Sequence, residues 1–240
     1  MPTLTQKLAN PSRFMALSAR LLPWVTAAAL IVLAVGLTLA AQAPPDYQQA
    51  HTVKIMFVHV PSAWLAYLAF FVTMAAGLGY LVRRDFRFDR VAVASAEIGV
   101  VFTGLAIVTG AIWGRPTWGR WWEWDPRLTT TAVLFLVYVG YLLLRSVIAD
   151  PDRRARVAAV IGLLGFLNVP IVHFSVLWWR SLHQPPTVIR PGDPTIDHLL
   201  LAQLLFSVVA FTLLYLWLIG RRILLERLEA ELWLSADGLR

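Results

Sequence analysis

Cysteine is absent from this chain of 240 residues, and charged residues are scarce. Without cysteine the chain forms no disulfide, offers no thiolate to a metal and carries no C-x-x-C-H motif for covalent haem attachment. Any metal ligand must therefore be a histidine, methionine or carboxylate side chain. Only 15% of the residues are charged, whereas soluble domains carry about 25%, so the composition argues against a soluble protein.

Apolar sequence is abundant instead, with 58% hydrophobic residues and a mean hydropathy of +0.65. A helix needs roughly 20 apolar residues to cross a hydrocarbon core about 30 Å thick. Six runs reach that length, at residues 21–41, 59–82, 91–113, 128–148, 157–179 and 198–220. We therefore expect an all-α integral membrane protein with six transmembrane helices in a single domain, residues 1–240.

Basic residues are distributed unevenly between the two sides of the membrane. Fifteen Lys and Arg lie before the first run, in the second and fourth connections (Arg145 included) and in the tail 221–240, against six in the other three connections. The positive-inside bias then places both termini in the cytoplasm and the connections 42–58, 114–127 and 180–197 outside. The same bias explains the net charge of +7 without nucleic acid as a partner.

The terminal segments carry further helical signals. Leucines between 224 and 232 have helical spacing, so we expect the tail to extend the sixth helix or to lie on the inner surface. Asn10-Pro11-Ser12 indicates the start of a short interfacial helix. Ala41-Gln42-Ala43 resembles a signal-peptide cleavage site, but the first run is long for a signal peptide and we expect it to be retained.

Tryptophan is concentrated in the outer segment 113–129, which holds five of the eleven tryptophans. An aromatic belt at the headgroup level is one explanation, but a belt needs only one or two indoles at a helix end. Interleaved glycines let the backbone fold back, and Pro116 and Pro126 restrict it. The segment therefore predicts a preformed apolar shelf, suited to flat conjugated rings, sugars or cations.

Three arginines in the same segment point to a ligand with anionic groups. Guanidinium pairs with carboxylate through two parallel hydrogen bonds, and a porphyrin with two propionates fits an apolar shelf beside Arg115, Arg120 and Arg127. The alternative is that these arginines pair with lipid phosphate, or with Glu123 and Asp125.

Five histidines are candidate iron ligands, because neutral imidazole is the usual haem ligand when thiolate is absent. His59 precedes Pro61, which we expect in the first turn of the second helix, and His183 precedes two prolines that prevent further helix. Taken alone, either histidine is better explained as a hydrogen-bonded interfacial residue than as an iron ligand. We expect His173 to be hydrogen-bonded between helices, with support of the site from below as the alternative, and His51 and His198 to be ordinary interfacial residues.

Glu97 is the one carboxylate well inside a predicted span, about 10 Å from the inner surface. An ionisable group at that depth is costly and invites a specific explanation. We expect a structural contact or a contact with a partner subunit rather than a proton-transfer role.

The motifs Trp113-Gly114, Trp118-Gly119 and Trp122-Glu123-Trp124-Asp125-Pro126-Arg127-Leu128-Thr129 carry a family resemblance. The chain resembles the tryptophan-rich (WWD) haem-handling membrane proteins of bacterial cytochrome c maturation, and among them the short six-span type called CcmC. The resemblance covers nearly the whole chain. It implies haem b held non-covalently at the periplasmic face of the inner membrane, with His59 and His183 as axial ligands. The further cofactor-binding residues that it implies are Trp64, Trp113, Trp118, Trp122, Trp124, Asp125 and Arg127.

The resemblance also implies partners and a relay function. An ABC transporter ATPase and permease and a small single-span membrane subunit would form a complex with this chain, and a periplasmic haem chaperone would receive the haem. This chain itself would not be an enzyme. The rival hypotheses are a membrane glycosyl or lipid-linked transferase, with Glu123 and Asp125 as acid and base, and a permease subunit without a cofactor.

Overall fold

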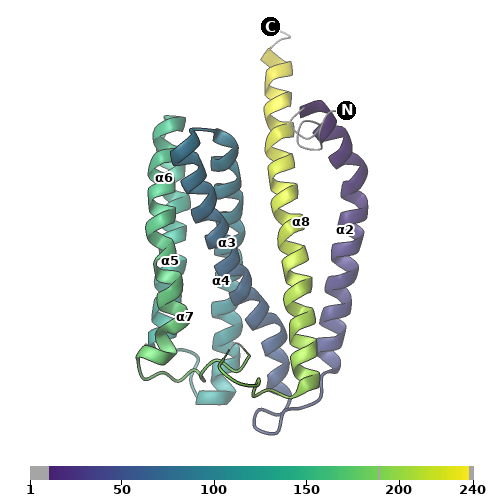
Figure 1. Ribbon diagram of the computed structural model, residues 1–240, viewed down its shortest axis with the longest axis vertical. Helices are drawn as coiled ribbons and strands as arrows, with labels where there is room; N and C mark the ends of the chain where they lie inside the picture. The colour runs from purple at the N-terminus through teal and green to yellow at the C-terminus, as the bar shows by residue number, and fades with distance from the viewer. Residues whose placement is uncertain (1–10, 189, 238–240) are drawn as a thin grey trace.

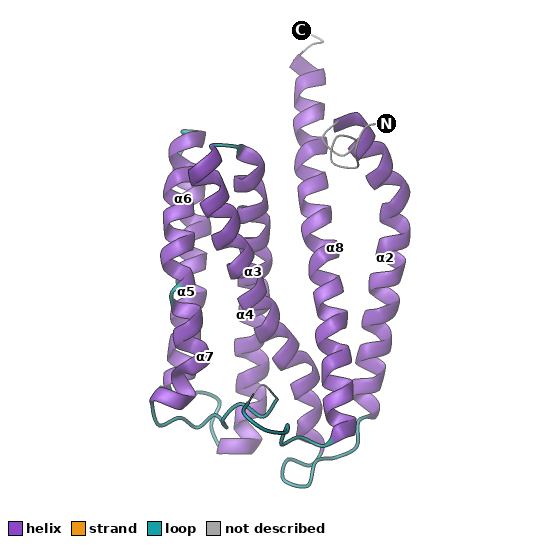
Figure 2. Cartoon of the chain, viewed as in Figure 1, coloured by secondary structure: helices purple, strands orange, loops and turns teal. Residues whose placement is uncertain are grey.

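The computed structural model describes residues 11–188 and 190–237, and within these ranges the chain is a bundle of helices without a β-strand (Figures 1 and 2). Six segments are long and apolar enough to cross a membrane, which confirms the predicted fold class. The elements are α2 (Pro11–Gln42), a 3-10 turn (His51–Ile55), α3 (Met56–Arg83), α4 (Phe86–Trp118), α5 (Pro126–Val147), α6 (Pro151–Phe166), α7 (Asn168–Trp178) and α8 (His198–Asp237).

The helices form two groups that lie next to each other (Figure 1). Helices α2 and α8 run side by side and are joined by a hydrogen bond of 2.8 Å from Trp217 Nε1 to the Thr26 hydroxyl. Helices α3 to α7 form the second group, and α8 packs against α3 and α4. The start of α2 and the end of α8 lie at one end of the bundle, called here the terminal end, and the connections 119–125 and 179–197 lie at the other, called the tryptophan end.

Aspartates set the starts of three of these helices. Asp85, Asp125 and Asp150 each accept a hydrogen bond from a backbone N–H of the first helical turn, which satisfies a donor that the helix itself cannot pair. Asp125 and Asp150 are each followed by a proline, whose fixed φ favours the first helical position. The starts of α4 and α6 after the two short connections at the terminal end, at Asp85 and Asp150, therefore follow from local sequence.

The fifth predicted span, 157–179, is in fact two helices that meet at Leu167. Pro170 lacks the N–H that would bond to the carbonyl four residues earlier, and its ring crowds that carbonyl. Asn168 instead donates its side-chain N–H to the Thr130 carbonyl at 2.8 Å, which anchors the break to α5. As a result α6 packs on α3, whereas α7 packs mainly on α5.

Two prolines lie deeper in their helices than we had expected. We had expected Pro61 in the first turn of a helix and Pro116 in a loop. Pro61 is in the interior of α3, because the helix already begins at Met56. Pro116 is in the last turn of α4, which continues to Trp118, so the expected fold-back of the backbone at 113–118 is wrong. The reversal takes place at Gly119, whose φ of 78° is open to glycine and costly for other residues.

Ion pairs hold the terminal end together. Arg145 on α5 makes two hydrogen bonds, of 2.6 and 2.8 Å, to the buried carboxylate of Asp89 on α4. Glu97 on α4 accepts hydrogen bonds of 2.7 and 3.1 Å from Arg222 on α8. The structural explanation of Glu97 is therefore confirmed.

The terminal segments continue the spans. Helix α8 runs without interruption to Asp237, so the tail extends the sixth helix, as one of the two alternatives predicted. Helix α2 begins at Pro11 and continues directly into the first span, so no separate interfacial helix is present from Pro11 onward; Asn10 lies outside the described residues.

The fold and the charge bias together predict the topology. The chain has no cysteine, so single cysteines can be introduced at Thr117 and Thr187, at the tryptophan end, and at Ala149, at the terminal end. In intact cells a membrane-impermeant thiol reagent should label the first two variants and not the third. If Ala149→Cys alone were labelled before lysis, the orientation of the chain in the membrane would be the opposite of the one predicted.

Candidate ligand site

A cavity of about 560 Å³ lies at the tryptophan end, among α3, α4, α5, α7 and the segment that follows α7. Its volume is within the range of roughly 300–1,000 Å³ that is usual for small-molecule sites. The wall is mostly apolar, with alanines, leucines and aromatic rings deep in the bundle, and its charged or titratable side chains are Arg127, Tyr67 and the histidines 59, 173 and 183. Such a wall suits a large apolar ligand that carries a few polar groups.

His59 projects from the second turn of α3 into this cavity. Its Nδ1 lies 3.2 Å from the Thr109 hydroxyl, which itself donates to the Leu105 carbonyl at 2.7 Å. Because the hydroxyl proton is used in that bond, the oxygen is free to accept a proton from Nδ1. Trp113 contacts the imidazole edge-on at a centroid distance of 5.6 Å, and Gly110 lies so close that an added Cβ would come within 2.9 Å of the ring.

His183 enters the cavity from the irregular segment that follows α7. Trp118 contacts its ring edge-on, with 4.8 Å between the centroids. Burial, aided by the nearby charge of Arg127, lowers the pKa of His183 to about 4, so the imidazole is neutral at physiological pH. A neutral imidazole is the form that can donate a lone pair to a metal ion.

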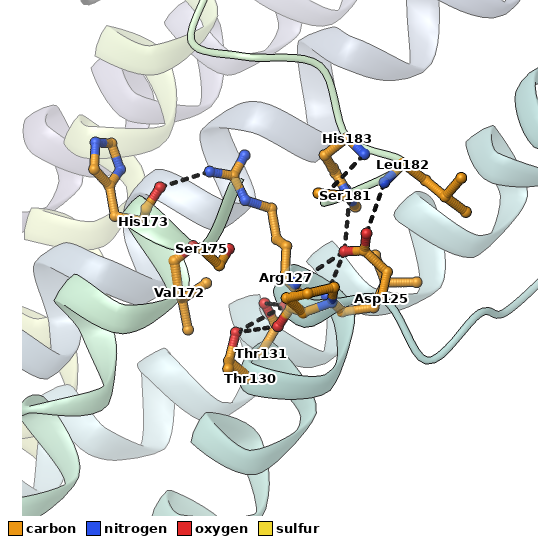
Figure 3. Close-up of polar contacts among 12 residues, drawn as sticks. Asp125, Arg127, Thr130, Thr131, Val172, His173, Ser175, Ser181, Leu182 and His183 are labelled. Atoms are coloured by element: carbon orange, nitrogen blue, oxygen red, sulfur yellow. Dashed lines mark hydrogen bonds and ion pairs between the residues drawn. The ribbon is translucent and has the colours of Figure 1, made fainter. Parts of the chain in front are cut away.

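Asp125 lies behind His183 and is only 5% exposed (Figure 3). Its carboxylate accepts hydrogen bonds from the backbone N–H of Arg127 at 2.9 Å and of Leu182 at 2.7 Å. Burial opposes its ionisation, but these bonds and one from the Ser181 hydroxyl outweigh burial and hold the pKa of Asp125 below its ordinary value. The ionised carboxylate lies 3.5 Å from Nδ1 of His183.

Arg127 extends from the first turn of α5 across the cavity wall (Figure 3). One guanidinium nitrogen donates to the His173 carbonyl at 2.7 Å, and the buried Nε has no hydrogen-bond partner among the described residues. No carboxylate forms an ion pair with Arg127 within residues 11–188 and 190–237. Arg127 is half-buried, and a cation in such a position without an ion-pair partner in these ranges is available to an anionic ligand.

Six of the nine residues expected at the site line the cavity: His59, Trp64, Trp118, Trp122, Arg127 and His183. The other three do not. Trp113 supports His59 from the side and donates its indole N–H to Gln49 at 2.8 Å. Asp125 lies behind His183, and Trp124 turns outward with 76% of its surface exposed.

Two further arginines are bound elsewhere. Arg115 donates to the Gly119 carbonyl and Arg120 pairs with Glu123, and neither arginine lines the cavity. The explanation by local pairing therefore holds for Arg120, and Arg127 is the only arginine of the three that faces the ligand space.

Known proteins match the chain over nearly its full length. A family profile described as heme exporter protein C, CcmC, matches residues 4–234. This chain belongs to the CcmC family. Heme exporter protein C of Bradyrhizobium diazoefficiens is 53% identical over 211 residues, which cover 88% of this chain and 80% of the relative. The proteins of the same name from Escherichia coli K12 and Haemophilus influenzae are 39% and 36% identical, over 87% and 93% of this chain and 84% and 91% of theirs.

Sequence reasoning missed Tyr67, which lines the cavity of this CcmC chain. His173 also lines the cavity, in agreement with the alternative of a supporting residue, and its ring packs edge-on against Tyr67 at 6.3 Å. Tyr67 lies two helical turns below His59 on the same face of α3, and that spacing could have identified it. His51 and His198 are exposed and outside the cavity wall, as expected of interfacial residues.

Proposed function

We propose that this CcmC chain binds haem b non-covalently in the cavity and relays it to a periplasmic haem chaperone during cytochrome c maturation. The observation that carries the proposal is that two histidines and one guanidinium without a counterion meet on a single apolar cavity. Imidazole is a usual axial ligand of haem iron, and arginine binds carboxylates such as propionates. The relatives' name, heme exporter protein C, agrees with this ligand.

In the proposed complex the iron is coordinated by His59 and His183, with Trp118 and Trp122 against the porphyrin and Arg127 beside a propionate. The cavity lies at the tryptophan end, which the charge bias assigns to the periplasmic face of the bacterial inner membrane. An acceptor in the periplasm can then reach the haem without crossing the bilayer. An ABC transporter ATPase, its permease and a small single-span subunit are the partners that we infer, and this chain acts as a binding subunit rather than as an enzyme.

A glycosyl or lipid-linked transferase is less well supported. That reaction needs two carboxylates facing the substrate. Glu123 is paired with Arg120, and Asp125 is buried as the cap of α5, so neither carboxylate lines the cavity.

Axial ligation by both histidines predicts a six-coordinate, low-spin absorption spectrum of the purified protein. His59→Ala or His183→Ala should lose haem or become high-spin, because one coordination position opens. Added imidazole should restore the low-spin bands in part, which a misfolded variant would not allow. His51→Ala, His173→Ala and His198→Ala are the controls and should keep the low-spin spectrum. If His59→Ala kept the low-spin spectrum and His173→Ala lost it, the haem site would lie deeper in the bundle than proposed.

Arg127 is predicted to hold a propionate. A hydrogen bond to a charged group contributes about 1.5–3 kcal/mol, so Arg127→Ala should weaken haem affinity by roughly tenfold or more at an unchanged protein level. Arg127→Lys should recover only part of the affinity, since an ammonium cannot form the bidentate pair. Haem dimethyl ester, which lacks the carboxylates, should bind wild type and Arg127→Ala about equally. An equal loss with haem and its ester would contradict the assignment.

Gly110 is predicted to keep the place of the His59 ring open. An alanine Cβ at this position would lie 2.9 Å from Cε1 of His59, so the ring must turn away from Thr109. Gly110→Ala should therefore shift bound haem toward the high-spin spectrum in a titration with added hemin. The matched control is Gly104→Ala on the same helix, whose Cβ would meet Phe135 at an ordinary 3.5 Å. Equal spectra of the two variants would show that the ring is not held as tightly as this geometry requires.

A further inference from the structure

The two histidines of the cavity have unlike partners at their Nδ1 atoms. Nδ1 of His59 faces the uncharged Thr109 hydroxyl at 3.2 Å, and Nδ1 of His183 faces the Asp125 carboxylate at 3.5 Å. Both residues line the cavity, and in each ring Nε2 is the nitrogen that these Nδ1 contacts leave for a ligand. The site is therefore asymmetric in charge although its two candidate ligands are chemically identical.

The proton of His183 is assigned by its surroundings. Nδ1 is buried and makes no hydrogen bond among the described residues, and a carboxylate oxygen can only accept a proton. The favourable arrangement places the proton on Nδ1, directed at Asp125, and a lone pair on Nε2. The distance of 3.5 Å is long for a hydrogen bond, but a metal ion on Nε2 makes the Nδ1 proton more acidic and the contact stronger.

Asp125 is held in place independently of His183. Its carboxylate accepts backbone N–H bonds from the first turn of α5 and from Leu182, next to His183 in sequence. The Ser181 hydroxyl accepts the backbone N–H of His183 at 3.1 Å, so the segment 181–183 is fixed against the start of α5. A carboxylate fixed in this position beside Nδ1 increases the electron density of the His183 imidazole and so makes its Nε2 a stronger metal ligand.

We propose that Asp125 makes His183 the firmly held axial ligand of the haem iron, and that His59, which has only neutral partners, is the ligand that is released first on transfer. A carboxylate partner gives the imidazole anionic character, strengthens its bond to iron and favours the ferric state. The inference rests on the proposed haem binding and assigns Asp125 as a positioning residue that does not touch the cargo.

The bond between iron and the retained histidine is the direct measure of this role. In the reduced protein, carbon monoxide replaces the weaker axial ligand, and photolysis leaves iron bound to the other one. The iron–histidine stretching frequency in resonance Raman spectra then rises with the anionic character of that histidine. Asp125→Asn, which keeps a good helix cap, should lower this frequency and shift the haem reduction potential to a more positive value.

Thr109→Val is the matched control, because Thr109 is the Nδ1 partner of His59 as Asp125 is that of His183. It removes the partner of His59 and should accelerate carbon monoxide binding, while the stretching frequency stays at the wild-type value. Ser181→Ala is a second variant, since it removes a donor from the carboxylate and leaves more negative charge for the imidazole. Its stretching frequency should move upward, opposite to that of Asp125→Asn.

The outcomes separate the two proposals. Wild-type protein that binds no haem contradicts the proposed function itself. Wild-type protein with low-spin haem, together with an unchanged stretching frequency in Asp125→Asn and Ser181→Ala, overturns only the role of Asp125. A frequency that moves in Thr109→Val and not in Asp125→Asn would make His59 the retained ligand and reverse the order of release.

Discussion

The carboxylate of Asp125 connects three parts of the chain that are far apart in sequence or differ in structure. It ends the tryptophan-rich segment, caps α5 and binds the backbone of Leu182, beside a candidate iron ligand. The cap is a local interaction, because the first backbone N–H groups of any helix need an acceptor. The bond to Leu182 is not local, and it gives the irregular segment after α7 a defined position on the bundle. This contact holds the backbone beside His183 against the start of α5, whereas His59 and His173 are positioned by the helices that carry them.

The arginines of the bundle differ in their partners, and this difference supports the proposal that the cavity binds an anionic ligand. Arg145 and Arg222 each have a carboxylate partner, which offsets the cost of a charge near lipid. Arg127 is close to the buried Asp125 in sequence, but that carboxylate is occupied by backbone N–H groups and by Ser181. The guanidinium instead contacts a carbonyl oxygen, and its buried Nε has no hydrogen-bond partner in the described part of the chain. In the proposed complex a carboxylate of the ligand would compensate this charge, since carboxylate is the group that guanidinium binds best.

The spans and the two principal histidines could be predicted from sequence, because membrane insertion depends on continuous apolar length and the motif around Asp125 is distinctive. Interior prolines were less informative. Pro61 and Pro116 lie within helices, whereas the fifth span divides near Pro170, where Asn168 donates to the Thr130 carbonyl across the helix interface. Which tryptophans face the ligand depends on helix rotation and on the turn at Gly119. For that reason the sequence could not show that Trp113 and Trp124, both expected to bind the cofactor, lie off the cavity wall.

The break in the fifth span gives the cavity its depth and its polarity. On the terminal side of Leu167, α6 packs on α3; on the tryptophan side, α7 packs mainly on α5, and Tyr67 of α3 contacts His173 of α7 at the cavity wall. The deep wall of Ala66, Leu134 and Val169 is apolar, while Arg127 and both candidate ligands lie toward the tryptophan end. In the proposed complex, a haem with its hydrocarbon edge toward the bundle centre and its carboxylates toward Arg127 matches this distribution of apolar and charged wall. The break in one helix and the cap of the next therefore act on the same proposed site, the first through the shape of its wall and the second through the position of the segment that carries His183.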